Sequence, residues 1–147
     1  MLSTGGFSIM AVPMRIPVSF GDVFPHGAFV LGVEADRDFD AVKAGLSDPQ
    51  VRDKETGLKV WLVRVLDAAP DLRAGQAEVK VKLAAEVQPV PPDTLAGTPF
   101  RPVEFDGLTV TAYVDQSRKT PRVGYSLRAR GMRAPMVASA RSGKAAA

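Results

Sequence analysis

The chain has 147 residues, 46% of them hydrophobic, which suits one domain with a single sizeable core. Because the chain has no cysteine and one histidine, its composition rules out disulfides, thiolate metal sites and metal centres built on several histidines. The net charge of +3 is unevenly distributed, because residues 118–147 hold eight basic side chains and no acidic one, and such a basic end favours an anionic partner.

Residues 1–15 are interpreted as an N-terminal extension. Their apolar stretch has no basic flank and is interrupted by Gly5, Gly6 and Pro13, so it does not resemble a signal peptide. The apolar runs of the chain are much shorter than the roughly 18 residues of a transmembrane helix. We therefore expect a cytoplasmic protein. His26, in the turn-like "FPHGAF", is interpreted as a loop histidine without a catalytic task.

The first predicted elements are a strand over 27–35 and a short helix in "DFDAVKAGLSDPQ". Asp38 or Asp40 would cap this helix and Pro49 would end it. The neighbouring carboxylates match no calcium-binding loop, and we interpret them as an acidic surface turn. We predict no metal ion and no cofactor. The carboxylates are those of Glu34, Asp36, Asp38 and Asp40.

Two strands are predicted in the middle of the chain. Residues 58–67 are apolar on both faces, which is typical of a central strand, and Trp61 is expected in the core. Residues 77–87 alternate: apolar side chains from Val79 to Val87 share a buried face, while Lys80 and Lys82 share the outer face. Five prolines between 89 and 102 predict an irregular connection, in which "PPDTLAG" forms at most one helical turn.

The last two predicted strands span 108–115 and 122–132, and both alternate with a period of two. In the first, Leu108, Val110, Ala112 and Val114 are predicted to point inward, and Thr109, Thr111, Tyr113 and Asp115 outward. In the second, Val123, Tyr125, Leu127 and Ala129 are predicted to be buried, and Arg122, Gly124, Ser126, Arg128 and Arg130 to lie outside.

These elements together predict a mainly β fold: a small antiparallel OB-like β-barrel over residues 16–135, with one or two short helices and an irregular proline-rich connection. Closing the barrel would remove exposed sheet edges. Residues 136–147, which include Arg141 and Lys144, are interpreted as a flexible basic tail.

The chemistry present indicates binding rather than catalysis. Neither a GxxxxGK[ST] nor a GxGxxG phosphate loop occurs, and no serine lies in a recognisable catalytic motif, so we do not expect an enzyme. Basic side chains and an outward tyrosine on strand faces are typical of proteins that bind single-stranded nucleic acid. Such cations also serve as ordinary protection of strand edges. The candidate nucleic-acid-binding residues are Lys80, Lys82, Tyr113, Arg122, Arg128 and Arg130.

Several blocks between residues 16 and 135 resemble one known family. They are "IPVSFGDVFPHGAF", "RDKETGLKVWLVRVLD", "KLAAEVQPVPP", "FRPVEFDGLTVTAYV" and "YSLRARGMRAP". Together they resemble the plasmid replication, integration and excision activators of actinomycete integrative and conjugative elements. The resemblance implies a cytoplasmic accessory protein of a mobile element and supplies no catalytic motif and no functional residue. "FDGLTVTAYV" followed by "YSLRARG" is also similar to the last strands of small phage-type single-stranded DNA-binding proteins of the OB-fold kind.

Three functions remain open at this point. The first is an accessory activator that binds single-stranded DNA through a basic strand face. The second is a transcriptional activator on duplex DNA, although no predicted helix is long enough to be a good recognition helix. The third is an adaptor that recruits the element's replication protein, with the proline-rich segment "VQPVPPDTLAGTPFRP" as its docking site.

Overall fold

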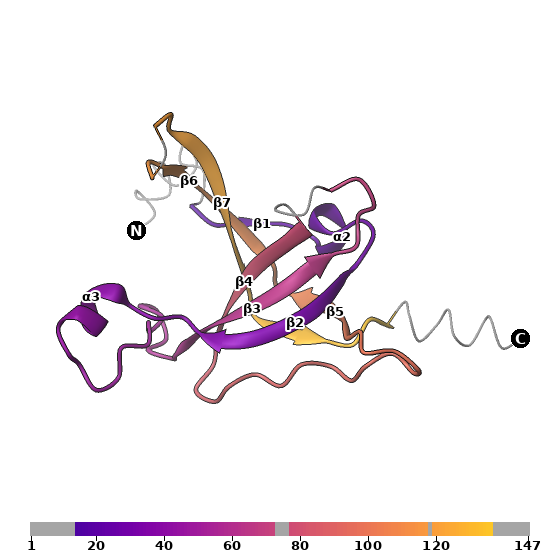
Figure 1. Ribbon diagram of the computed structural model, residues 1–147, viewed down its shortest axis with the longest axis horizontal. Coiled ribbons are helices and arrows are strands. Elements are labelled where there is room, and N and C mark those ends of the chain that lie inside the picture. The colour runs from indigo at the N-terminus through magenta and orange to yellow at the C-terminus, as the bar shows by residue number, and fades with distance from the viewer. Residues whose placement is uncertain (1–13, 73–76, 118, 137–147) are drawn as a thin grey trace, which may run out of the picture.

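The computed structural model describes residues 14–72, 77–117 and 119–136. Eight strands and two short helices lie in these residues (Figure 1). In chain order they are β1 (Ile16–Pro17), α2 (Phe20–Val23), β2 (Ala28–Ala35), α3 (Phe39–Lys43), β3 (Val60–Asp67), β4 (Glu78–Ala84), β5 (Pro102–Asp106), β6 (Thr109–Asp115), β7 (Arg122–Ala129) and β8 (Gly131–Arg133). Of the predicted N-terminal extension and basic tail, all but Met14, Arg15 and Met136 lies outside the described residues.

The strands form one sheet in the order β1-β6-β7-β4-β3-β2-β5-β8. β2, β3 and β4 make an antiparallel meander, and β4 then pairs with β7 in parallel. β5 pairs with β2 and runs almost directly into β6, which pairs with β7. This bent segment joins the two sides of the sheet, which curls into a half-barrel with β1 and β8 at its ends. The prediction of a mainly β, small barrel-like fold is therefore confirmed, with β4–β7 as the one parallel pair among the described strands.

The bend between β5 and β6 depends on Gly107. Its φ of +61° is in the left-handed region, which glycine adopts without steric cost. A Cβ at this position would overlap the side chain of Arg130, which crosses the bend. Opposite it, the last predicted strand breaks at Arg130 into β7 and β8, and β8 pairs with β5. The bend thus needs both the torsion angle and the missing side chain of glycine.

The core lies inside the curled sheet and follows the predicted alternation. Val63, Val65 and Val81 are fully buried on facing positions of β3 and β4, while Lys80 next to them is exposed. Helix α2 covers one end of the barrel, where Phe20 and Phe24 contact Phe105 of β5, with ring centroids 6.2 and 6.5 Å apart. The whole buried cluster is Phe24, Ala28, Val30, Val63, Val65, Val81, Leu83, Val103, Phe105, Leu108, Leu127 and Ala129.

The structure has two short helices, within the predicted number, but their positions and lengths differ from the sequence-based expectation. Asp38 caps α3 as predicted, accepting hydrogen bonds from the backbone of the first turn, but the helix ends at Lys43. Residues 91–97, expected to form at most one helical turn, form no helix; a turn is closed there by the Thr98 N–H donating to the Leu95 carbonyl at 2.9 Å. Two adjacent prolines remove backbone donors, and Gly97 adopts a positive φ that a helix does not contain.

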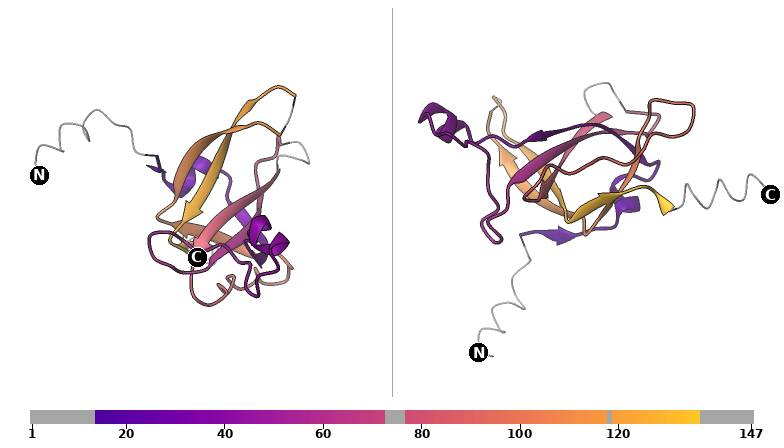
Figure 2. Two further views of the ribbon diagram at one scale, coloured as in Figure 1. Left: turned by 90° about the vertical axis from the view of Figure 1, so that its left-hand side faces the viewer. Right: turned by 90° about the horizontal axis from the view of Figure 1, so that it is seen from below.

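The hairpin of β6 and β7 extends well beyond the barrel (Figures 1 and 2). Only Leu127, Arg128 and Ala129 of β7 pair with β4, so the distal part of the hairpin has no neighbouring strand there. The predicted burial of four residues of this hairpin is therefore wrong, because nothing in the described residues packs on their face. These exposed residues are Ala112, Val114, Val123 and Tyr125. Val87 is exposed as well, since β4 ends three residues before it.

Candidate nucleic-acid interface

An open groove of about 640 Å³ lies on the outer face of the sheet, where β3, β4, β6 and β7 meet. Four of the six predicted nucleic-acid-binding residues border it, and six further residues complete its lining. The predicted four are Lys80, Lys82, Tyr113 and Arg128. The others are Arg15, Asp36, Leu62, Thr111, Tyr125 and Ser126.

The pairing of the strands brings these side chains together. Lys82 lies opposite Arg128 in the parallel β4–β7 pair, and Arg128 lies opposite Thr109 of β6. Lys80 is two residues from Lys82 on the same strand, so both point to the same face of the sheet. Three cations from two strands therefore line one surface, although 46 residues of the sequence separate Lys82 from Arg128.

The groove is cationic, and its cations differ in how they are paired. Lys82 Nζ lies 3.9 Å from Asp36, and Arg15 Nη1 lies 3.3 Å from Glu55. Partly exposed pairs of this kind contribute less than about 1 kcal/mol, so a phosphate can replace either carboxylate. Lys80 forms no ion pair with any of the described residues and is the cation most available to a ligand.

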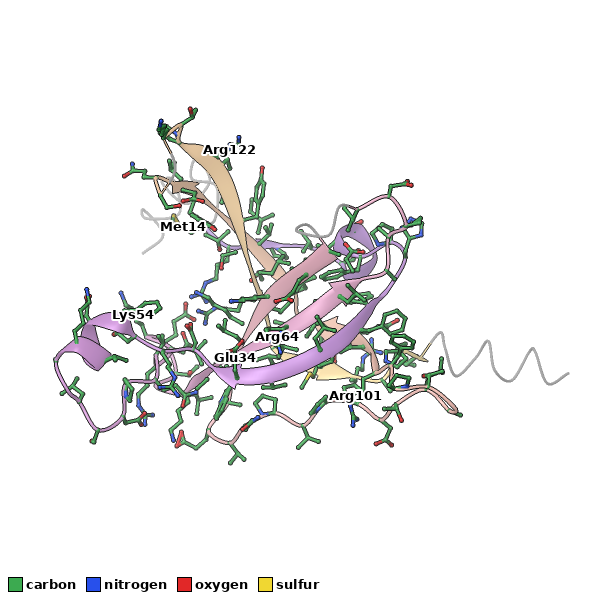
Figure 3. The ribbon with its side chains drawn as sticks, viewed as in Figure 1. Met14, Glu34, Lys54, Arg64, Arg101 and Arg122 are labelled. Atoms are coloured by element: carbon green, nitrogen blue, oxygen red, sulfur yellow. The ribbon has the colours of Figure 1, made fainter. Side chains whose placement is uncertain are left out.

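The positive surface ends at the neighbouring strands. On the outer face of β3, Arg64 lies beside Glu34 (Figure 3), with Nε 3.3 Å from the Glu34 carboxylate. Its Nη1 lies 3.7 Å from a second carboxylate, that of Glu78. Its guanidinium also lies over Gly32 of β2, where a Cβ would meet it at 3.0 Å. These charges offset one another, so the excess of positive charge is confined to the side of β4 and β7.

Arg128 lies on the outer face of the sheet, as predicted, and an ion pair with Asp53 also holds its side chain in place. Its Nη1 lies 3.3 Å from a carboxylate oxygen of Asp53, whose side chain is 8% exposed. Asp53 also accepts a hydrogen bond from the Thr56 hydroxyl at 2.9 Å. That hydrogen bond, helped by the Glu55 N–H and the positive charge of Arg128, holds the pKa of Asp53 below its ordinary value of 3.8, although burial acts in the opposite direction. Arg128 therefore anchors the 53–57 turn against the sheet as well as facing the groove.

The Asp53 contacts make stability depend on pH. A carboxyl whose pKa is lower in the folded chain stabilises the fold fully above the unfolded pKa, here 3.8, and loses this contribution as pH falls through the folded pKa. We expect Asp53→Asn to lower the free energy of unfolding by about 1–3 kcal/mol at neutral pH, with the difference from wild type shrinking below pH 3.8. Urea unfolding at a series of pH values measures this.

Asp93→Asn is the matched control, because Asp93 is exposed and forms no ion pair within the described part of the chain. It should leave stability within about 0.5 kcal/mol of wild type. If Asp53→Asn and Asp93→Asn behave alike over the whole pH range, the carboxylate of Asp53 does not hold the turn against Arg128.

Tyr113 lies at one side of the groove, half exposed, as the alternation of β6 predicted. Its ring covers Gly124, the residue opposite it on β7, so closely that any Cβ there would overlap the ring. A glycine beneath an aromatic ring of the facing strand fixes the ring on the sheet surface while leaving its other face accessible. Tyr125 also borders the groove and is 67% exposed.

The remaining two predicted residues lie elsewhere. Arg122 is opposite Asp115 at the distal end of the hairpin, where Figure 3 shows it far from Arg64. Arg130 lies in the break between β7 and β8 and covers the Gly107 bend, so it does not continue the row of Arg128. Arg122 and Arg130 therefore do not join Arg128 in the groove, whose cations come from several strands.

The acidic residues and the single histidine do not form a second chemical centre. Glu34 pairs with Arg64, Asp36 pairs with Lys82, and Asp38 caps α3. Within residues 14–72, 77–117 and 119–136, no three His, Asp or Glu side chains gather closely enough to hold a metal ion. His26 is exposed in a turn beside a mainly apolar hollow of about 810 Å³ between α2 and β5. None of the helices in the described ranges has the length and apolar character needed to cross a membrane.

The groove contains residues that the sequence did not single out. Thr111 and Ser126 were placed outward by alternation, but neither has a charge or ring to mark it as part of a site. Arg15 falls in the predicted N-terminal extension and reaches the groove because β1 pairs with β6, some 90 residues away. No local sequence pattern indicates a contact between residues so far apart in the chain.

Comparisons of the chain with protein-family models, with curated proteins and with solved structures find no match.

Proposed function

We propose that this protein binds single-stranded DNA in the groove between β4, β6 and β7, as an accessory activator of the replication, integration and excision of a mobile element. The observation that supports binding is the convergence of Lys80, Lys82, Arg128 and Tyr113 on one open surface. Cations follow the phosphates of a single strand, and an exposed ring stacks on a base without reading its sequence. The mobile-element role rests on the sequence resemblance.

Single-stranded DNA suits this surface better than duplex DNA. The longest helix in the described residues has five residues, which is too short to fill a major groove as a recognition helix. Stacking on Tyr113 requires a base whose face is free, and duplex bases are already stacked on their neighbours. We therefore expect tighter binding of an oligonucleotide as a single strand than as a duplex of the same sequence.

Salt dependence tests the role of the two lysines. Each single-strand phosphate neutralised changes the slope of log affinity against log salt by about 0.7, so Lys80→Ala combined with Lys82→Ala should make the slope shallower by about 1.4. Binding should weaken to a similar extent for all sequences, because phosphate contacts carry no base information. Fluorescence anisotropy of labelled oligonucleotides at several salt concentrations measures both quantities.

Arg130→Ala is the matched control: it removes an exposed cation outside the groove and should leave the slope unchanged. A lysine double variant with wild-type affinity and wild-type slope would show that Lys80 and Lys82 are only a solvated strand face. Arg128 is unsuitable for this test, since its loss would also leave Asp53 without its partner.

The adaptor function is supported by one separate observation. In the proline-rich segment 87–102, Val87 and Val90 are 76% and 84% exposed, although both are apolar. Exposed apolar side chains in an extended segment are typical of a docking site for another protein. This function predicts that neither single-stranded nor duplex DNA binds with measurable salt dependence, so the same titrations separate the two proposals.

A further inference from the structure

Two of the four cations that line the groove are paired with carboxylates of the 53–57 turn. Arg15 Nη1 lies 3.3 Å from Glu55, and Arg128 Nη1 lies 3.3 Å from Asp53. The two carboxylates are only two residues apart in the sequence, whereas the two arginines are far apart. One short turn therefore brings two negative charges to the positions where the arginines would otherwise meet phosphates.

The turn keeps its shape through its own backbone bonds. The Asp53 N–H donates to the Leu58 carbonyl at 2.8 Å, and the Gly57 N–H donates to the Asp53 carbonyl at 2.7 Å. Arg52 and Lys59 form a β-bridge at the base of the turn. Because none of these bonds involves a residue of the groove, an ion pair to the groove can break while the turn stays folded.

The two carboxylates differ in how easily a phosphate can replace them. The Asp53 side chain is 8% exposed and accepts a hydrogen bond from the Thr56 hydroxyl, so it stays with Arg128. The Glu55 side chain is 73% exposed, and the Arg15 side chain opposite it is 40% exposed. Exposed pairs of this kind are weak, so a phosphate that reaches Arg15 can displace Glu55.

We propose that Glu55 is a built-in competitor of the bound strand: it occupies Arg15 in the free protein and must leave before Arg15 can hold a phosphate. This inference rests on the proposed function, because Glu55 competes only where a polyanion enters the groove. The contribution of Arg15 to affinity is then the difference between its contact with phosphate and its contact with Glu55. The competitor lowers affinity without removing a cation from the groove.

Titration of the full-length protein with labelled single-stranded oligonucleotides tests the competition. Glu55→Gln keeps the size of the side chain and removes its charge, so it should raise affinity about two- to fivefold at low salt. The gain should shrink as added salt screens the pair. In an Arg15→Gln background, Glu55→Gln should give no gain, because the group for which it competes is absent.

Asp48→Asn is the matched control. It removes a carboxylate that lies 3.5 Å from an exposed arginine, Arg52, and neither residue lines the groove, so affinity should stay near that of wild type. Equal gains from Glu55→Gln and Asp48→Asn would overturn the proposal, since net charge alone would then explain them. A gain that persists in the Arg15→Gln background would overturn it as well.

The same titrations separate this inference from the proposed function. Wild-type protein that binds single strands, with Glu55→Gln binding no more tightly, would overturn the competition and leave the groove as the binding site. Wild type and variants that all fail to bind single strands at low salt would overturn both.

Discussion

Replacing Tyr113 by alanine is expected to weaken the binding of single-stranded DNA by about 1–3 kcal/mol, which is roughly 5- to 150-fold in the dissociation constant. The ring is half exposed at the side of the groove, and the neighbouring cations, Lys80 and Lys82, would hold the phosphates of a strand whose base it contacts. Because base stacking is not specific to sequence, the loss should be similar for oligonucleotides of different composition. Equilibrium titrations with labelled single strands measure the effect.

Tyr113→Phe is the control for this prediction, since it keeps the ring and removes only the hydroxyl. If base stacking is what Tyr113 contributes to the affinity, Tyr113→Phe should bind single-stranded DNA nearly as tightly as wild type. The ring also covers Gly124, so Tyr113→Ala should lower stability by up to about 1 kcal/mol, the scale of a cross-strand pair. Unchanged binding with lowered stability would show that Tyr113 only supports the hairpin.

The largest effect on stability is expected at Phe105. This residue of β5 is 3% exposed and contacts Phe20 and Phe24 at the covered end of the barrel. Phe105→Ala should lower the free energy of unfolding by about 3–5 kcal/mol, because it removes a buried ring and leaves a cavity. Since β5 is also the strand that joins the two sides of the sheet, its loss from the core would open the barrel.

Urea unfolding followed by circular dichroism measures this loss. Phe39→Ala is the matched control: Phe39 is 77% exposed on α3, and its removal should change stability by no more than about 0.5 kcal/mol. If Phe105→Ala and Phe39→Ala both lower the free energy of unfolding by equally small amounts, β5 does not pack on the core as described. A helix-dominated spectrum of the wild-type protein would contradict the fold altogether.

The candidate site was only partly accessible to sequence reasoning. Alternation correctly assigned Lys80, Lys82 and Arg128 to outer faces, because the pleat alone decides that property. It did not show that Arg128 is anchored by Asp53, since that contact joins residues 75 positions apart. Nor did it separate Arg130 from the row, because the break at this residue depends on the bend at Gly107 on another strand.

Local pattern identified β2, β3, β4, β6 and the stretch of β7 and β8, and the face that each of their side chains takes, since both follow from a two-residue period and from glycine and proline at the turns. It missed β1 and β5. Only the assembled sheet decided which of those faces is covered. Val81 and Val114 have the same local pattern, yet one is fully buried and the other exposed. The difference is that β4 lies between two strands over the core, whereas the distal hairpin extends past it, and burial depends on neighbours that are distant in sequence.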